Sequence, residues 1–445
     1  MIKENSTERS RNYLQQLKGA VIYRAVAITA SFIAIPLMIN YLGQEQFGIW
    51  STLLSVMSWV IFFELGIGNG MRNKVAEYLA KDEKAKAVNY ISSGYALIGL
   101  IGLFLWVVIT TISYFVPWQG VFNTIKISED TLGNTFRIVT FFVVLNFWLG
   151  LISSLLSALQ KTSLIALGQL ITNLLVLTFV FVLSKFTSAS IINLAFAYGL
   201  SITSANLLLS IWFFRTNPEL LSTLCIDKQH ISPLLAIGLQ FFIIQFAVLI
   251  IFSTDKILIT QLFGPSFVTE YEVVFKLFSV ITLAHGLIST PLWSAYTDAY
   301  HRSDFKWIRQ MLNKQLIIFM GIFCAVIILC LSTKSILAIW IEGELDVSFS
   351  LIVLMGAFVL ISSWNNIFAM LVNGIGKITL QLYTAVAAMV VNIPLSIFFG
   401  INTSLGISGI VLGTICSLVF ASIALPLQVT QQINSLTKIQ QNVSK

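Results

Sequence analysis

Residues 250–276, IIFSTDKILITQLFGPSFVTEYEVVFK, combine the end of a long apolar helix with charges that rarely occur inside a bilayer. Asp255 and Lys256 stand among Phe, Ile and Leu. A charge at bilayer depth costs at least ~2.5–3.5 kcal/mol, so such a residue usually faces protein or a water-filled cavity and has a function. Adjacent helical residues project about 100° apart, so these two charges cannot share one direction. The alternative is a structural ion pair with another helix, or a Lys256 side chain that extends to the membrane surface.

The composition of the chain indicates a polytopic membrane protein. Of its 445 residues, 57% are hydrophobic and 10% charged, and the mean hydropathy is +0.88. Soluble domains carry about 25% charged residues. The net charge of +7 is concentrated in short segments between apolar runs, so it does not imply a nucleic-acid partner. The cysteines Cys324, Cys330 and Cys416 lie inside apolar runs, which excludes a disulfide framework or a C-x-x-C site.

Apolar runs of about twenty residues are long enough to cross the hydrocarbon core as helices. The chain contains twelve of them, and we therefore predict an all-α protein with twelve transmembrane helices. Their expected bounds are roughly 20–42, 48–70, 90–115, 135–158, 163–184, 191–214, 234–263, 269–292, 313–332, 348–373, 378–399 and 406–428. In the last of these runs, Gly409 and Gly413 form a G-x-x-x-G pattern that is typical of close helix packing.

The distribution of basic residues predicts the orientation of these helices. With the N-terminus in the cytoplasm, 19 of the 26 Lys and Arg residues fall in inner segments, and only Lys126, Lys185 and Lys334 fall in outer loops. Both termini are therefore expected in the cytoplasm. The inner loop 71–90 is expected to form an interfacial helix, with Glu77/Lys81 and Asp82/Lys86 spaced for i,i+4 pairing, or else a plain solvated connector.

A shift of 221 residues reveals an internal repeat. It aligns the first two spans with the seventh and eighth, and it pairs Gly43 with Gly264 at an outer turn. It also pairs Arg24 with Gln245 and Glu64 with His285, so rare intramembrane polar residues coincide. Repeats of six helices have the same orientation and are related by an axis along the membrane normal. We therefore expect two pseudo-symmetric six-helix lobes around a central cavity, an N-lobe at 1–216 and a C-lobe at 217–445.

The sequence does not favour an enzyme, a metal site or a bound cofactor. The three histidines, His230, His285 and His301, are far apart and form no ligand spacing such as H-E-x-x-H. A nucleotide-binding P-loop is also missing, because Gly376 and Lys377 are followed by Ile378 instead of Ser or Thr. We therefore predict no catalytic residue and no metal ligand.

The candidate functional residues are the embedded ions. Positively charged Arg and Lys side chains would attract an anionic ligand. The candidates for substrate binding are therefore Arg24, Arg137, Lys256 and Lys276. Buried carboxylates can bind H⁺ or Na⁺, which makes Glu64 and Asp255 the candidates for ion coupling. Arg24, Arg137 and Lys276 lie near helix ends, where a long side chain can also simply reach the interface. Polar amides that would bind a sugar or join helices are Asn146, Asn173, Asn365, Asn366 and Asn392.

Four segments resemble a known family of transporters. They are FELGIGNGMRNKVAEYLAKDEKAKAVNYIS (63–92), TDKILITQLFGPSFVTEYEVVFKLF (254–278), PLWSAYTDAYHRSDFKWI (291–308) and NGIGKITLQLYTAVAAMVVNIPLSI (373–397). They are similar to the O-antigen and polysaccharide flippases of Wzx type, which belong to the multidrug/oligosaccharidyl-lipid/polysaccharide exporter superfamily. The resemblance covers both halves of the chain, although no single motif is diagnostic.

This resemblance implies alternating access in a bacterial inner membrane and an undecaprenyl-diphosphate-linked oligosaccharide as substrate, destined for O-antigen and lipopolysaccharide. It also implies membrane lipid, a polysaccharide polymerase and chain-length proteins as partners, and no catalytic residue. An ion-coupled drug/cation antiporter of the same superfamily is the main alternative, but the cationic Arg24 and Lys256 favour an anion. A membrane glycosyltransferase or polymerase would need a large outer loop or a clustered acid/base set, and the sequence has neither.

Overall fold

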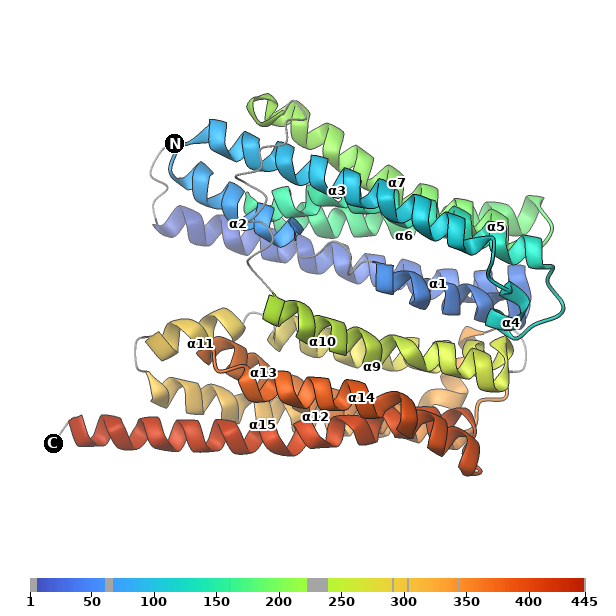
Figure 1. Cartoon of the computed structure of the whole chain (residues 1–445). Helices are drawn as coiled ribbons and strands as arrows, with labels where there is room; N and C mark the ends of the chain where they lie inside the picture. The colour runs from blue at the N-terminus through green and yellow to red at the C-terminus, as the bar shows by residue number, and fades with distance from the viewer. Residues whose placement is uncertain are drawn as a thin grey trace. The chain divides into compact units, whose positions relative to one another are not determined.

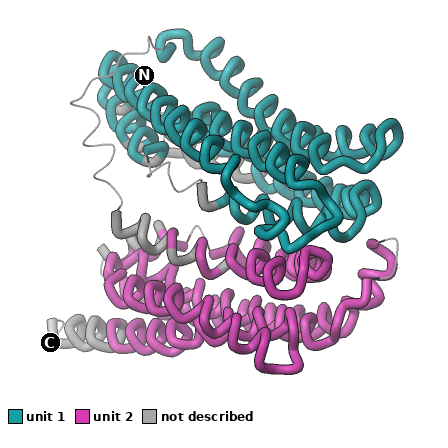
Figure 2. Tube along the Cα trace, turned by 45° about the vertical axis from the view of Figure 1, so that its right-hand side comes forward, with its two compact units in different colours: residues 1–242 teal, residues 243–445 magenta. Residues whose placement is uncertain are grey.

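A computed structural model describes residues 6–60, 67–159, 161–221, 239–289, 292–301, 304–341 and 345–443. Within these ranges the chain is helical and contains no strand, as predicted. The chain divides into two compact units, Met1–Phe242 and Ile243–Lys445 (Figure 2). The expected lobe boundary at 216/217 stays a prediction, since residues 222–238 lie outside the described ranges.

Unit 1 consists of long helices that run side by side, with two short helices in the connections (Figure 1). In chain order these are α1 (Ser6–Val60), α2 (Ile67–Ala80), α3 (Lys84–Ser113), α4 (Trp118–Phe122), α5 (Glu129–Ala158), α6 (Thr162–Phe186) and α7 (Ile191–Thr216), followed by the 3-10 turn η2 (Pro218–Leu220). The helices from the second unit are α9 (Leu239–Phe263), α10 (Pro265–Ser289), α11 (Leu292–His301), α12 (Phe305–Trp340), α13 (Phe349–Ile375), α14 (Thr379–Asn402) and α15 (Ile407–Val443).

Ten described helices are long and apolar enough to cross a membrane. One of them, α1, is interrupted at Gly43, whose φ of 77° and ψ of 166° are not helical, so α1 contains the first expected span and most of the second. A further helix, α9, covers most of the seventh expected span. The total of twelve stays a prediction. Two helices, α12 and α15, extend well beyond the apolar runs, because a helix continues into its polar ends while hydropathy marks only the part that faces lipid.

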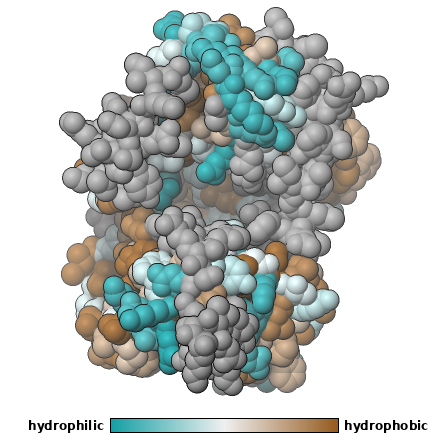
Figure 3. Space-filling model, turned by 90° about the vertical axis from the view of Figure 1, so that its left-hand side faces the viewer, coloured by the Kyte–Doolittle hydropathy of each residue, from teal (hydrophilic) through white to brown (hydrophobic). Residues whose placement is uncertain are grey.

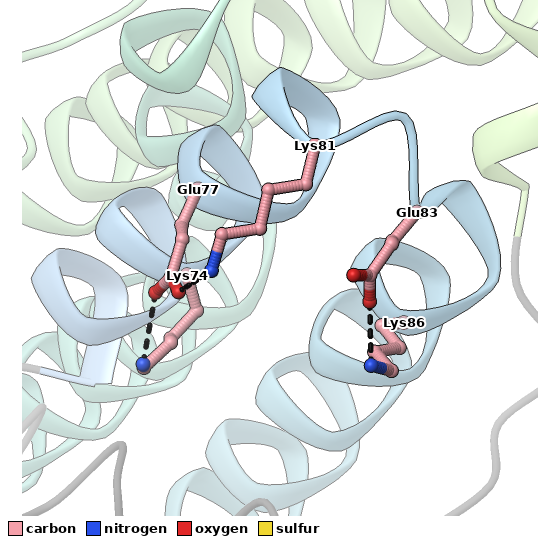
Figure 4. A network of polar contacts seen from close by, with 5 residues as sticks. All are labelled: Lys74, Glu77, Lys81, Glu83 and Lys86. Atoms are coloured by element: carbon pink, nitrogen blue, oxygen red, sulfur yellow. Dashed lines mark hydrogen bonds and ion pairs between the residues drawn. The ribbon is translucent and has the colours of Figure 1, made fainter.

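Helix α2 confirms a helix in the loop 71–90, but not its predicted bounds, because the helix ends at Ala80 and residues from Lys84 onward belong to α3. Its residues Ile67, Met71 and Val75 are fully buried in a core cluster with residues of α3, α5 and α7, so the segment is not a plain connector. On its surface, Glu77 pairs with Lys81 at 2.6 Å as predicted, and also with Lys74 at 3.0 Å (Figure 4).

The predicted Asp82/Lys86 pair is wrong. Asp82 lies in the turn between α2 and α3 with a φ of 58°, so it is not on the same helix as Lys86 and the i,i+4 spacing does not apply. Instead, Lys86 pairs with Glu83 at 2.5 Å (Figure 4). Hydrogen bonds from Lys81 and Lys74 lower the pKa of Glu77 to about 2.

Basic side chains gather at one end of each unit. In unit 1 the exposed Lys81, Lys84 and Lys86 lie around the α2–α3 turn. In unit 2 the α12 start and the α13–α14 turn carry exposed Lys306, Arg309, Lys314 and Lys377. Figure 3 shows hydrophilic side chains on the face that it draws. The helices of each unit thus carry polar residues at this end and apolar residues along their length.

Helices α14 and α15 pack closely at Gly409 and Gly413, which confirms the close helix packing predicted from the G-x-x-x-G pattern. A Cβ on Gly413 would overlap the backbone of Ser396, and one on Gly409 would overlap the carbonyl of Phe399. Glycine at these two positions therefore allows the two backbones to touch. This contact places the polar residues of α14 and α15 next to α9.

Candidate functional site

The candidate site is built on the hairpin of α9 and α10. The turn is at Gly264, whose φ of 102° favours glycine. After the turn, α10 runs back along α9, so residues at similar distances from Gly264 come together. Asp255 lies next to Tyr271 and Lys256 next to Glu272. The two adjacent charges point to different neighbours, as the helical geometry predicted.

Asp255 is buried, with 2% of its surface exposed, and each carboxylate oxygen accepts a hydrogen bond. Thr414 Oγ1 on α15 donates to Asp255 Oδ1 at 2.8 Å. Tyr271 OH on α10 donates to Asp255 Oδ2 at 3.2 Å. No basic side chain lies within ion-pair distance of this carboxylate in the described part of the chain. Thr414 and Tyr271 both donate to this carboxylate through hydroxyl groups, so the acid keeps its capacity to bind a cation or a proton.

Asn392 of α14 extends the site. Its Nδ2 donates to Thr414 Oγ1 at 3.0 Å and to Ser417 Oγ at 3.4 Å, and its Oδ1 accepts from Thr254 Oγ1 at 3.2 Å. All of these side chains are buried. The result is a continuous polar network from α9 through α15 to α14, inside otherwise apolar helices. Such a network holds the Asp255 carboxylate in one position.

Lys256 pairs with Glu272, with 2.5 Å between Nζ and Oε2 and side-chain exposures of 15% and 18%. This is the ion-pair alternative considered for Lys256. Lys276 lies one helical turn after Glu272 and is half-buried. The hairpin thus brings two lysines close to the same glutamate.

The other candidates are on unit 1. Arg137 of α5 donates to Asn134 Oδ1 at 2.8 Å and to Ser113 Oγ at 3.4 Å. Its guanidinium also stacks on Tyr114, 4.2 Å from the ring centroid. It is therefore anchored at the end of α3. Arg24 is exposed on α1, and Glu64 lies outside the described residues.

Sequence reasoning missed three residues of the site, Tyr271, Glu272 and Thr414, whereas Asn392 was among the amides considered for binding a sugar or joining helices. A signal for Glu272 was present, because Lys256 and Glu272 are equally far from the glycine of the turn. No local signal identifies the partners of Asn392 and Thr414 on α9, which are 138 and 159 residues away in the sequence. The described residues contain no cluster of three His, Cys, Asp or Glu that could hold a metal ion.

Most of the asparagines considered for sugar binding join helices instead. Asn173 Nδ2 donates to Ala27 O at 2.8 Å and links α6 to α1. Asn206 Nδ2 donates to Asn146 Oδ1 at 2.5 Å and links α7 to α5. Asn365 Nδ2 donates to Leu418 O at 3.3 Å and links α13 to α15.

Comparisons with known proteins relate the chain to polysaccharide export. A family model described as polysaccharide biosynthesis protein matches residues 17–297. A Salmonella typhimurium protein named as an O-antigen transporter is 23% identical over 403 residues, which cover 86% of this chain and 88% of the relative. A Yersinia pseudotuberculosis protein named as an O-antigen export protein is 21% identical over 360 residues, covering 80% of this chain and 82% of the relative.

Among solved structures, an inward-facing multidrug resistance MATE family transporter of the MOP superfamily has a TM-score of 0.79. The alignment covers 94% of this chain and 99% of that chain at 15% sequence identity. This likeness confirms the predicted fold, an all-α transporter fold of that superfamily.

Proposed function

Because the chain belongs to the polysaccharide biosynthesis protein family, we propose that it is a flippase for a polysaccharide precursor. It moves an undecaprenyl-diphosphate-linked oligosaccharide, such as an O-antigen repeat unit, across the bacterial inner membrane. A central cavity opens alternately to the two leaflets of the membrane. The two lobes that form it are residues 1–216 and 217–445. The observation that carries this proposal is the likeness, over most of the chain, to two proteins named for O-antigen transport and export.

The lysines of the α9–α10 hairpin are proposed to bind the diphosphate. Lys256 pairs with Glu272, and Lys276 lies one helical turn after that glutamate, so two ammonium groups lie near each other on the hairpin. A diphosphate offers several oxygen acceptors to such a pair of ammonium groups. Arg24 and Arg137 are the further candidates for contacts with the substrate.

Asp255 is proposed to bind the coupling ion, H⁺ or Na⁺. Its carboxylate is buried and is ligated by the hydroxyls of Thr414 and Tyr271, which leaves its charge uncompensated. A bound cation or proton would neutralise that charge. Glu64 is the corresponding candidate in the first half of the chain.

The orientation proposed for the chain has both termini in the cytoplasm. The exposed lysines and arginines at one end of each unit support it, because cytoplasmic loops are rich in these residues. A polysaccharide polymerase and chain-length proteins would take over the product at the opposite face.

A drug/cation antiporter is the second candidate, and the fold likeness to a multidrug resistance transporter favours it. Deleting the gene in a host without another flippase distinguishes the flippase from the antiporter. A flippase predicts that lipid-linked repeat units accumulate and that surface polysaccharide disappears. Drug hypersensitivity with normal surface polysaccharide would establish the antiporter instead. Restoration by the wild-type gene, but not by an Asp255→Asn variant of equal membrane abundance, would tie the defect to transport.

A further inference from the structure

Four buried polar side chains on α10, α12 and α13 lie outside the site described above and each contain an atom without a hydrogen-bond partner in the described structure. They are His285 and Ser289 on α10, Gln315 on α12 and Ser363 on α13, with exposed fractions of 4%, 1%, 2% and 2%. In each, one atom makes no hydrogen bond within the described residues: His285 Nε2, Ser289 Oγ, Gln315 Oε1 and Ser363 Oγ. An unpaired polar group in an apolar interior is unfavourable, so these four side chains on three adjacent helices require an explanation.

The glycine at 356 sets the register of the three helices. A Cβ on Gly356 of α13 would lie 2.8 Å from Cys330 Sγ, 2.9 Å from Val326 Cγ1 and 3.4 Å from Phe278 Cε1. Helices α10, α12 and α13 therefore meet at this level, with these residues turned toward one another. A ring contact at 5.3 Å between centroids, Phe319 of α12 with Trp364 of α13, confirms the register further along.

The four polar residues lie on the same helix faces as these contacts. His285 is seven residues after Phe278, and Ser363 is seven residues after Gly356. A step of seven residues rotates the side-chain direction by two full turns minus about 20°, so it returns to nearly the same face. Ser289 is eleven residues after Phe278 and Gln315 is eleven residues before Val326, and a step of eleven residues rotates the direction by three full turns plus about 20°. All four side chains therefore point toward the shared axis of α10, α12 and α13.

Their depths also agree. At 1.5 Å per residue, His285 and Ser363 lie about 10 Å from the Gly356 level, and Ser289 and Gln315 about 16 Å from it, all in the direction of α11. One base and three groups able to accept a hydrogen bond thus converge within two adjacent turns of a three-helix core. This cluster is distinct from the Asp255 network, since His285 is about 21 Å along α10 from Tyr271.

We propose that His285 is a proton-binding site whose imidazolium is held by Gln315, Ser289 and Ser363. Both nitrogens of a protonated imidazole donate hydrogen bonds, whereas a neutral ring has one donor only. The unpaired Oε1 of Gln315 is an acceptor, and each serine Oγ can accept as well. The cluster therefore supplies more acceptors than a neutral histidine can use. The inference does not depend on which substrate the protein moves.

The carboxylates of α10, Glu270 and Glu272, are 13 or more residues before His285, and α12 and α13 contain none. Helix α13 has no titratable residue, and Lys306, Arg309 and Lys314 of α12 are exposed. On α9 and α10 the charged groups are Asp255, Lys256, Glu270, Glu272 and Lys276, and the nearest of them, Lys276, is on the opposite face of α10 nine residues away. Helix α11 carries the buried Tyr296 together with Asp298, Tyr300 and His301. The three acceptors proposed for a proton on His285 are themselves neutral.

The chain has only three histidines, which makes a direct test practical. The double variant His230→Gln/His301→Gln leaves His285 as the single imidazole, whose ¹⁵N resonances are followed in lipid from pH 5 to 9. One titration is expected. Gln315→Met should lower its midpoint by about one pH unit by removing an acceptor, and Gln315→Glu should raise it by at least as much.

Gln310→Met is the matched control, because Gln310 lies on the same helix with its side chain exposed, and it should leave the midpoint unchanged. If Gln315→Met does not accumulate, the upward shift in Gln315→Glu and a downward shift in Ser363→Ala decide the question. An imidazole that stays neutral over the whole range, or a midpoint that ignores these substitutions, overturns the proposal and leaves a hydrated structural cluster.

Discussion

Lys256 and Glu272 form an ion pair of 2.5 Å, and each is eight residues from Gly264 in the turn that joins their helices. The pair thus follows from the geometry of an antiparallel helix hairpin with a left-handed glycine at its tip. Gly43, which the internal repeat aligns with Gly264, also has a positive φ, of 77° against 102°. The two halves of the chain therefore use glycine in the same way at the corresponding turn.

The first prediction concerns this ion pair. Lys256→Met should lower the amount of folded protein, because it leaves the Glu272 charge without its partner. Breaking a fully buried pair costs about 3–5 kcal/mol, and we expect about 2 kcal/mol for this half-buried one. Adding Glu272→Gln should restore abundance without restoring export, since the cation for the substrate is still missing. Membrane abundance and surface polysaccharide are measured in the same strains.

Lys334→Met, at an exposed position of α12, serves as the control for removal of a lysine. Full export by Lys256→Met at normal abundance would eliminate both the structural and the substrate-binding role, and would move the site toward Arg24 and Arg137.

The second prediction concerns Asp255. Asp255→Asn keeps the size of the side chain and should leave abundance nearly normal while export loses its dependence on the ion gradient. Asp255→Leu strands the hydroxyls of Tyr271 and Thr414 and should cost about 1–3 kcal/mol for each group left unpaired. Transport into vesicles with imposed H⁺ or Na⁺ gradients measures the coupling. Unchanged gradient dependence in Asp255→Asn would exclude this residue as the coupling site.

The third prediction concerns helix packing. Gly413→Ala should separate α14 from α15, because its Cβ would overlap the backbone of Ser396, and we expect a loss of about 1–3 kcal/mol. Gly321→Ala is the matched control in α12, where nothing lies within 4 Å of the new Cβ. There, alanine should raise helix stability by up to about 1 kcal/mol. Thermal denaturation of the purified proteins in detergent compares the two, and equal melting points would contradict the packing argument.

The fourth prediction concerns Glu77. Its pairs with Lys81 and Lys74 hold its pKa near 2, below the ordinary value of 4.5. A lowered folded-state pKa stabilises the protein above the unfolded value, and the contribution is lost as the pH falls through the folded value. Glu77→Gln should therefore melt lower than wild type at pH 7, and the difference should shrink between about pH 4.5 and 2. Glu219→Gln, with its long 3.8 Å pair to Lys84, should show a smaller difference at pH 7.

The fifth prediction concerns topology. A reporter active only in the cytoplasm should be active when fused after Lys445 and silent when inserted at Ser188, in the α6–α7 connection. The reason is the excess of basic residues in the segments assigned to the cytoplasm. Activity at Ser188 would refute the proposed orientation.

Local chemistry was enough to predict the helical, membrane-spanning class, the divergent directions of Asp255 and Lys256, the helix at α2 and the glycine contact of α14 with α15. Each depends on neighbours in the sequence, on hydropathy over about twenty residues or on the 100° step of a helix. The Asp82/Lys86 pair was wrong because one residue with a left-handed backbone breaks that step.

The identity of each partner was decided only by tertiary packing. Asp255 is ligated by Thr414, 159 residues away, and Asn392 connects α14 with both α9 and α15. Similarly, the close approach of α10, α12 and α13 at Gly356 joins residues that are far apart in the sequence. A sequence specifies which face of a helix is polar, but which helix covers that face depends on how the long apolar surfaces pack, and this is a property of the whole unit.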